Sequence, residues 1–262
     1  MVFLSIVIPA YNEESRIGGS LDAILRFLIA QSYQGEVVVV DDCSSDDTSG
    51  IVAARTAQYR EAGHELRILK NTPNRGKGFS VKRGLTESRG EVVLFTDADL
   101  SSPITEAPKL VRPIAAGTAD VTFGSRALDR GLIGVRQPLI RDFGGRVFNL
   151  FMRAITGLRF KDTQCGFKAF RRELALPVFK RQSIERFGFD PEILYIAKKR
   201  GLRLIEVPVV WNDSEGSTVS YASDSLKMFI DLIRIRFNDL SGRYDGDDTF
   251  GLEVQNTIGK AG

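Results

Sequence analysis

Short apolar runs, each followed by a cluster of polar residues, constrain the fold of this chain most strongly. The runs at 3–8, 36–40 and 91–95 are rich in valine, isoleucine, leucine and phenylalanine, and helical patterns lie between them. Strands that alternate with helices indicate a mostly parallel sheet flanked by helices. The first half of the chain therefore predicts an α/β fold.

The second half is less regular but predicts further elements of the same kinds. Over the whole chain we expect strands at 3–8, 36–40, 66–69, 91–95, 121–123, 166–170 and 203–211. We expect helices at 14–30, 46–59, 78–88, 103–116, 191–200 and 222–237, and an apolar, arginine-studded stretch at 139–158. Residues 1–240 are predicted to form a single domain, and the polar tail at 241–262 is predicted to be disordered.

Composition excludes several classes of site. The chain has 262 residues, one histidine (His64) and two distant cysteines (Cys43 and Cys165), so a His/Cys metal cluster, a disulfide framework and a serine-hydrolase triad are not expected. A bound divalent ion would need oxygen ligands, which favours Mg²⁺ or Mn²⁺. The net charge of +3 is too small to indicate a nucleic-acid-binding protein. We find neither a signal peptide nor an apolar stretch long enough to span a membrane.

Three predicted strands end in polar clusters: Pro9-Ala10-Tyr11-Asn12-Glu13, Asp41-Asp42 and Asp97-Ala98-Asp99. The carboxyl ends of parallel strands share one edge of a sheet, and ligands of such sheets bind there. Each cluster alone is also compatible with a turn or a helix cap. That alternative explains three clusters together poorly, so we predict a binding site at this edge.

The acidic triplet predicts a metal site. Asp97 and Asp99 are two residues apart in an extended segment, so both carboxylates can point to the same side. A hard cation that also contacts phosphate oxygens would relieve their repulsion and would neutralise a departing nucleoside diphosphate. The alternative is a purely structural turn.

The Asp41-Asp42 cluster and the basic segment 74–78 fit other parts of a nucleotide. Asp41 and Asp42 can accept hydrogen bonds from a base and a ribose. Arg75 and Lys77, in the glycine-flexed segment 74–78, can meet the diphosphate or the base, unless this is only a solvated basic loop. The segment matches neither a Walker loop nor GxGxxG, which disfavours a dinucleotide cofactor.

These segments together resemble glycosyltransferase family 2, with its GT-A fold. The resemblance runs from about residue 3 to 240 and includes 7–14, 40–44, 74–78 and 96–100. In the second half, Asp162-Thr163-Gln164-Cys165-Gly166-Phe167-Lys168, 207–211 and 215–217 resemble the polyprenyl-phosphate sugar synthases. The sequence of residues 97–103 is more similar to that of the dolichyl-phosphate β-glucosyltransferase branch than to that of the mannosyl branch.

The resemblance implies UDP-glucose as donor, a polyprenyl phosphate as acceptor and inversion at the anomeric carbon. It places Pro9, Tyr11, Glu13 and Asp42 at the nucleoside, Asp97 and Asp99 at the metal, and Arg126 beside the diphosphate. GDP-mannose remains a possible donor, and a soluble hydroxyl compound remains a possible acceptor. A non-catalytic sugar-nucleotide-binding module is a more distant alternative.

An acceptor phosphate monoester is already anionic at neutral pH and needs cations rather than a general base. The candidate cations are Arg126, Arg130, Arg136 and Lys168. A hydroxyl acceptor would need a base, for which Asp190 is the candidate. Asp190 can instead cap the helix predicted at 191–200, and we favour the cap slightly.

Two amphipathic stretches suggest a membrane surface. Residues 136–159 combine five arginines with aromatic and aliphatic side chains, and 226–237 repeat this mixture. Such stretches suit the headgroup region of an anionic bilayer, although burial in the core explains either one alone. Together with a lipid acceptor they predict peripheral attachment to the cytoplasmic face of a membrane.

Overall fold

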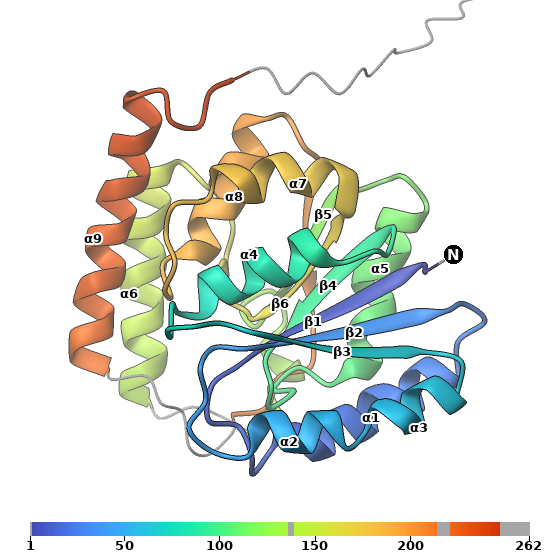
Figure 1. The fold of residues 1–262 in the computed structure, drawn as a ribbon. Helices are drawn as coiled ribbons and strands as arrows, with labels where there is room; N and C mark the ends of the chain where they lie inside the picture. Colours follow the sequence, from blue (N-terminus) through green and yellow to red (C-terminus); the bar gives the residue numbers. More distant parts are fainter. Residues whose placement is uncertain (1, 136–138, 214–220, 247–262) are drawn as a thin grey trace, which may run out of the picture.

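The protein is described by a computed structural model that covers residues 2–135, 139–213 and 221–246 (Figure 1). A seven-stranded sheet has the order β3-β2-β1-β4-β6-β5-β7, and its strands are parallel except for β6, which is antiparallel to both β4 and β5. The strands are β1 Leu4–Ala10, β2 Gly35–Asp41, β3 Glu65–Lys70, β4 Val92–Thr96, β5 Val121–Ser125, β6 Phe167–Arg171 and β7 Leu204–Pro208.

Helices lie on both faces of the sheet (Figure 1). The α-helices are α1 Ile17–Ile29, α2 Thr48–Ala53, α3 Thr56–Glu61, α4 Lys77–Glu87, α5 Ala107–Ala115, α6 Leu139–Thr156, α7 Arg172–Arg181, α8 Phe189–Lys199 and α9 Tyr221–Leu240. Two short 3-10 helices, η1 Ile104–Glu106 and η2 Arg130–Leu132, precede α5 and α6.

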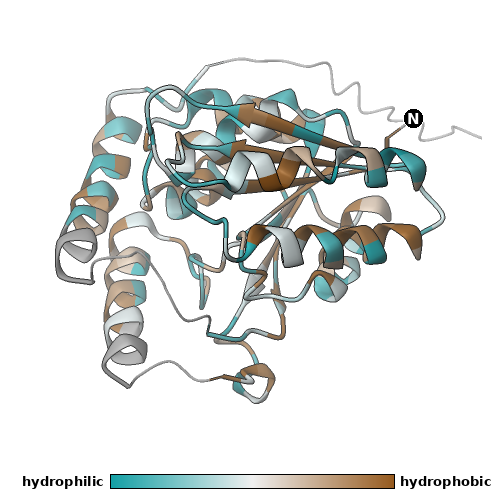
Figure 2. Ribbon diagram, turned by 60° about the horizontal axis from the view of Figure 1, so that its bottom comes forward, coloured by the Kyte–Doolittle hydropathy of each residue, from teal (hydrophilic) through white to brown (hydrophobic). Residues whose placement is uncertain are grey.

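Alternation along β1 creates two hydrophobic cores. Leu4, Ile6 and Ile8 pack with α1, α2 and α5 on one face, whereas Val7 packs with α4, α7 and α8 on the other. Successive strand side chains point to opposite faces, so a strand buried on both sides is almost uniformly apolar. Figure 2 shows this as hydrophobic strands between helices of mixed character. Gly84 lets α4 approach β1, because a Cβ there would lie 2.3 Å from Val7 Cγ1.

The sheet reverses its winding between β1 and β4. From β1 the chain moves outward through β2 to β3, then returns to place β4 on the opposite side of β1. Val7 pairs with Phe95, so the segment that follows β4 emerges beside the end of β1. Such a reversal leaves a crevice outside the carboxyl ends of the two strands, where ligands of α/β sheets bind.

The structure confirms the α/β prediction and changes several elements. The helix predicted at 46–59 is two helices, because the chain turns between Ala53 and Thr56. Helix α7 was not predicted, since Pro177 interrupts its pattern. The domain boundary at 240 stays a prediction, and residues just beyond it pack against α8. Tyr244 is buried and its hydroxyl donates to Glu192 Oε1 at 2.7 Å; residues 247–262 lie outside the described part.

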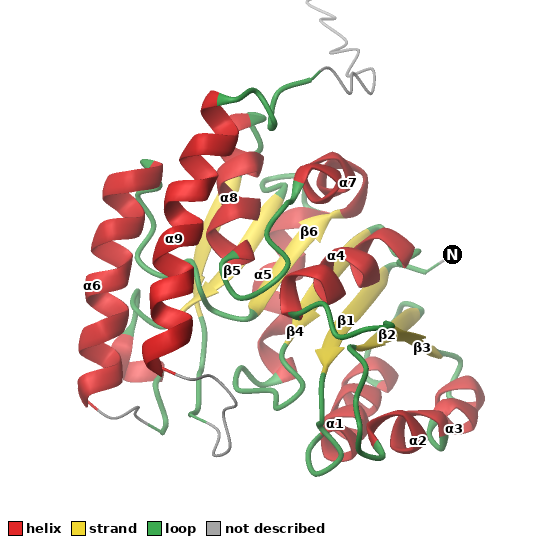
Figure 3. Cartoon of the chain, turned by 60° about the vertical axis from the view of Figure 1, so that its left-hand side comes forward, coloured by secondary structure: helices red, strands yellow, loops and turns green. Residues whose placement is uncertain are grey.

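Helices α6 and α9 stand side by side at one flank of the sheet (Figure 3). The rings of Phe151 and Phe229 meet edge to face between them, with centroids 5.3 Å apart. The inner sides of the two helices are buried through Met152, Leu232 and Ile235. The amphipathic stretches predicted from the sequence thus form one paired element.

Candidate active site

Backbone strain concentrates at the three polar strand ends. Among the described residues, the non-glycine residues with positive φ are Asn12 (54°), Cys43 (67°) and Leu100 (49°). They follow β1, β2 and β4 respectively. Such conformations cost free energy in L-residues and cluster at functional sites. The strain therefore supports the prediction that this edge of the sheet carries the function.

Asp97 leaves the end of β4 between a lysine and a glycine. Lys77 Nζ, at the first residue of α4, lies 2.5 Å from Asp97 Oδ1. On the other side of the carboxylate, a Cβ at Gly166 would lie 2.0 Å from Asp97 Oδ2. Only glycine leaves room for the carboxylate there. Asp97 keeps 34% of its side chain exposed, so it remains accessible.

The rest of the acidic triplet is fixed by neighbouring segments. Ala98 is buried, and its carbonyl accepts a hydrogen bond from Ser20 Oγ of α1 at 2.6 Å. The Asp99 carboxylate accepts from the Ser101 N–H at 2.9 Å. The Ser101 carbonyl in turn accepts from the N–H of Asn212, beyond β7, at 2.8 Å. The triplet is therefore held from both halves of the chain.

Negative charge accumulates around this triplet. Burial raises the pKa of Glu13 above its ordinary value; Arg16 opposes the rise, and the charges of Asp99 and Asp97 add to it. Oxygen donors with unfavourable mutual repulsion suit a hard divalent cation. Asp97 and Asp99 thus fit Mg²⁺ or Mn²⁺ chemically. No cluster of three or more Asp, Glu, His or Cys side chains suited to a metal occurs in the described part, so further ligands must come from elsewhere.

Asp41 and Asp42 support the loops around the expected nucleoside. Asp42 is buried; its Oδ1 accepts from Asn71 Nδ2 at 2.7 Å and from the Arg75 N–H at 2.9 Å, and its Oδ2 accepts from the Gly76 N–H at 2.6 Å. Asp41 Oδ1 accepts from the Ser44 N–H at 2.9 Å. Both carboxylates are engaged by their own protein in this structure. Direct contact with a ligand stays a prediction for them.

Three further predicted site residues lie near the carboxyl-end edge of the sheet: Pro9, Tyr11 and Arg75. Pro9 is half-buried near the end of β1, and Tyr11 is 45% exposed. The Arg75 guanidinium pairs with Glu185 and stacks over Phe79, with 3.8 Å from Cζ to the ring centroid. Tyr11 and Arg75 therefore border the site with accessible side chains.

Arg126 follows β5 and is fixed by Asp162, an acid for which the sequence predicts no role. Its Nε and one terminal nitrogen donate to Asp162 at 2.6 Å and 2.9 Å, and its guanidinium faces Trp211. Burial disfavours both charges, but their pairing raises the pKa of Arg126 and lowers that of Asp162. Asp162 is the first residue of the 162–168 motif, so its place in that motif is the sequence pattern that indicates it.

Lys168 and Asp190 form a buried ion pair. Lys168 is fully buried on β6, and its ammonium contacts Asp190 and donates to the Cys165 carbonyl at 2.7 Å. The interpretation of Asp190 as a helix cap is wrong, because α8 begins at Phe189 and Asp190 lies inside its first turn. Burial raises the pKa of Asp190, while Lys168 and Lys77 oppose that rise. Neither partner of the pair is exposed to an acceptor.

Of the two remaining candidate cations, one lies within the described residues. Arg130 is exposed on η2. Arg136 and the 215–217 motif lie outside the described residues.

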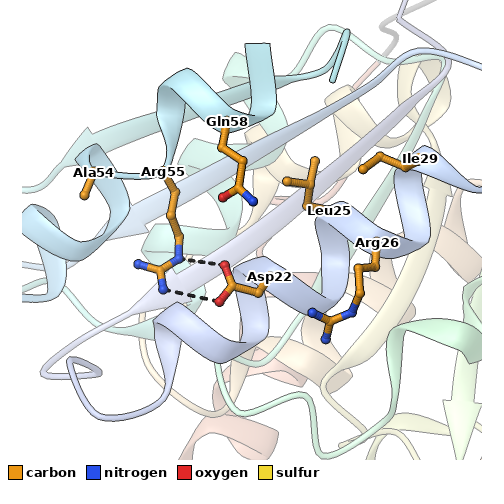
Figure 4. Close-up of a pocket in the computed structure, with 7 residues that line it drawn as sticks. All are labelled: Asp22, Leu25, Arg26, Ile29, Ala54, Arg55 and Gln58. Atoms are coloured by element: carbon orange, nitrogen blue, oxygen red, sulfur yellow. Dashed lines mark hydrogen bonds and ion pairs between the residues drawn. The ribbon is translucent and has the colours of Figure 1, made fainter. Parts of the chain in front are cut away.

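A surface pocket lies elsewhere, between α1 and the α2–α3 segment (Figure 4). Its floor carries an ion pair in which Arg55 Nε lies 2.9 Å from Asp22 Oδ1. Its lining side chains are Asp22, Leu25, Arg26, Ile29, Ala54, Arg55 and Gln58. None of the predicted site residues is among them, so the candidate active site remains at the strand ends.

Comparison with known proteins agrees with the geometry. Residues 5–179 match the family described as Glycosyl transferase family 2. The chain belongs to glycosyltransferase family 2. This glycosyltransferase is 36% identical over 251 residues to the dolichyl-phosphate beta-glucosyltransferase of Dictyostelium discoideum. The aligned region covers 92% of the chain and 76% of the relative. The proteins of that name from Saccharomyces cerevisiae and Homo sapiens are 36% and 34% identical, covering 93% and 94% of the chain and 77% and 78% of the relatives.

Solved structures confirm the GT-A fold of the transferase. Glucosyl-3-phosphoglycerate synthase from Mycobacterium tuberculosis in complex with UDP superposes with a TM-score of 0.64 at 21% identity, covering 89% of this chain and 80% of that one. The same enzyme with Mn²⁺, UDP-glucose and phosphoglyceric acid gives 0.64 at 21% identity, covering 96% and 83%. At this identity the likeness concerns the fold alone.

Proposed function

We propose that this glycosyltransferase moves glucose from UDP-glucose to a dolichyl or other polyprenyl phosphate, with inversion and with Mg²⁺ or Mn²⁺ bound at Asp97 and Asp99. The observation that carries the proposal is the similarity, along about nine-tenths of the chain, to proteins named dolichyl-phosphate beta-glucosyltransferase. The two accessible carboxylates at the reversal of the sheet support the metal assignment.

The proposed reaction needs a bound metal ion but no general base. When bound, the divalent ion supplies charge neutralisation for the leaving diphosphate. Asp97 and Asp99 would hold it. Ser101 donates to the Asp99 carboxylate, Gly166 leaves room for the Asp97 carboxylate, and Ser20 bonds the carbonyl of Ala98 between them. The acceptor phosphate is already anionic at neutral pH, so it attacks without a general base. This agrees with the engagement of Asp190, the candidate base, by Lys168.

Radiolabel partition tests this function. Purified protein with Mn²⁺ and dolichyl phosphate should transfer label from UDP-glucose, in preference to GDP-mannose, into an organic-soluble product. Asp99→Asn should reduce the initial rate about 100-fold or more, the scale of losing one group that stabilises developing charge. Equal transfer from GDP-mannose would refute the donor assignment. A labelled product that stays in the water phase would refute the acceptor assignment.

The lipid acceptor also requires access to a membrane, and the α6–α9 pair provides a surface for it. In the described part, seven of the exposed large hydrophobic side chains lie on these helices: Val147, Leu150, Phe151, Ile230, Ile233, Phe237 and Leu240. Exposed Arg153, Arg234 and Lys227 lie among them. An apolar surface with basic side chains suits an anionic bilayer, and the cytoplasmic leaflet is anionic. No helix of the described residues is long and apolar enough to cross a membrane.

Vesicle flotation tests this attachment. Phe237→Glu should reduce binding to phosphatidylcholine vesicles containing phosphatidylserine at least tenfold, because a buried phenylalanine contributes about 1.5–3 kcal/mol. Ile29→Glu on α1 is the matched control, since Ile29 is 58% exposed on a different helix. Equal loss in both variants, or no loss with Phe237→Glu, would contradict the assignment of the membrane surface to α6 and α9.

A further inference from the structure

Lys77 forms an ion pair with the Asp97 carboxylate oxygen that a divalent ion would bind. Its Nζ lies 2.5 Å from Asp97 Oδ1, and the backbone of Gly166 approaches Oδ2 so closely that a Cβ there would lie 2.0 Å from it. The chain therefore already provides one positive charge at the position where the proposed function requires a second cation. A lysine ammonium and a metal ion cannot share one carboxylate oxygen without strong repulsion.

The position of Lys77 depends on the loop expected to contact the donor. Lys77 begins α4 directly after Gly76, whose φ of 103° is a conformation that favours glycine. The N–H groups of Arg75 and Gly76 donate to the Asp42 carboxylate. A nucleotide that binds against this loop thus meets the same segment that carries the ammonium.

The ammonium of Lys77 is paired with an acid. Its Nζ contacts Asp97, and 21% of the lysine side chain is exposed. Asp190 is itself paired with Lys168, so its charge is already partly balanced. The diphosphate of an incoming donor would therefore be the anion near Lys77 that most needs a cationic partner.

We propose that Lys77 excludes the divalent ion from Asp97 in the nucleotide-free enzyme and moves to the diphosphate when the donor binds. The inference rests on the proposed function, because it takes Asp97 as a metal ligand. The described residues provide few metal ligands of their own, so the diphosphate supplies both missing oxygen ligands and a new partner for the lysine. Metal and nucleotide then bind with positive coupling, and Mn²⁺ alone binds weakly.

Electron paramagnetic resonance of free Mn²⁺ tests this coupling without any acceptor. The full chain is titrated with Mn²⁺ in the absence and presence of UDP. Lys77→Gln should increase the Mn²⁺ affinity of the nucleotide-free protein by about tenfold, within the range usual for coupled ligands, and should shrink the gain produced by UDP. Lys77→Arg keeps the charge and should behave like the wild type. Lys180→Gln, at an exposed lysine on α7, is the matched control.

Two outcomes would overturn the inference in different ways. Equal Mn²⁺ affinity of the wild type and Lys77→Gln without UDP, in variants with unchanged melting temperature, would show that the lysine does not exclude the metal. Unchanged Mn²⁺ binding by Asp97→Asn in the presence of UDP would overturn both the inference and the proposed metal site. Failure of glucose transfer to dolichyl phosphate would instead refute the proposed function while leaving the Mn²⁺ measurement interpretable.

Discussion

The contact between Gly166 and Asp97 gives the sharpest test of the site geometry. In Gly166→Ala the new Cβ would lie 2.0 Å from Asp97 Oδ2 and 2.5 Å from its Cγ, whereas ordinary contact begins at 3.4 Å. The carboxylate must therefore move by about 1.4 Å (3.4 − 2.0) unless β6 shifts instead. Gly166 is not among the glycines with positive φ, so its backbone conformation suits alanine.

A displacement of this size should reduce the catalytic rate strongly and change the stability of the fold little. Misplacement of a catalytic group by about 1 Å reduces rates about 100-fold, which corresponds to about 2.7 kcal/mol of transition-state stabilisation. We expect this loss in kcat/KM for UDP-glucose, measured by label transfer to dolichyl phosphate. The melting temperature should change little, since Asp97 is partly exposed.

Gly19→Ala in α1 is the matched control. A Cβ at Gly19 meets nothing within 4 Å, and alanine in a helix adds up to about 1 kcal/mol of stability. This variant should keep full activity. Gly166→Ala that retained kcat/KM within about threefold of the wild type would refute the reasoning, because Asp97 would then tolerate displacement.

Three further perturbations follow from the same geometry. Asp42→Asn places an amide N–H₂ against the N–H donors of Asn71, Arg75 or Gly76. It should cost about 1–3 kcal/mol of stability, measured by urea unfolding, and weaken UDP binding in calorimetry. Asp162→Asn leaves Arg126 without its anion and should cost about 2–3 kcal/mol at pH 7, less than a fully buried pair because 28% of the Arg126 side chain is exposed. Pairing with Arg126 outweighs burial and lowers the pKa of Asp162 below 3.8. The stability difference between wild type and Asp162→Asn is therefore fully present at neutral pH and should shrink as the pH falls below about 4, which unfolding curves at stepped pH would measure. Excess chelator should abolish transfer and added Mn²⁺ should restore it; transfer that persists without metal would contradict the metal assignment.

Local patterns predicted the strand ends because each is encoded within a few residues. Asp97 and Asp99 follow directly after the apolar run 92–95, and the parallel pairing of β1 and β4 brings this segment to the carboxyl-end edge of the sheet. The same logic predicted the two amphipathic stretches, since their mixture of apolar and basic residues is visible in sequence, but not that they pack against each other. The metal and nucleoside roles assigned to individual side chains stay predictions.

Contacts between distant segments could not be predicted. The Asp162 partner of Arg126 is 36 residues away, and Ser20 reaches Ala98 across 78 residues. The antiparallel insertion of β6 between β4 and β5 buries Lys168 against Asp190, although the sequence makes Lys168 a candidate cation for the acceptor phosphate. Burial is set by topology, and the sequence pattern of a five-residue strand does not specify its neighbours.

The structure of the lipid product tests the central claim most directly. The chain is incubated with UDP-glucose, Mn²⁺ and dolichyl phosphate, and the anomeric configuration of the purified product is determined by proton NMR. The account predicts a β-linked glucosyl phosphate on the lipid, formed by wild type and lost with Asp99→Asn. An α-linked product, or glucose attached only to a water-soluble compound, would contradict it.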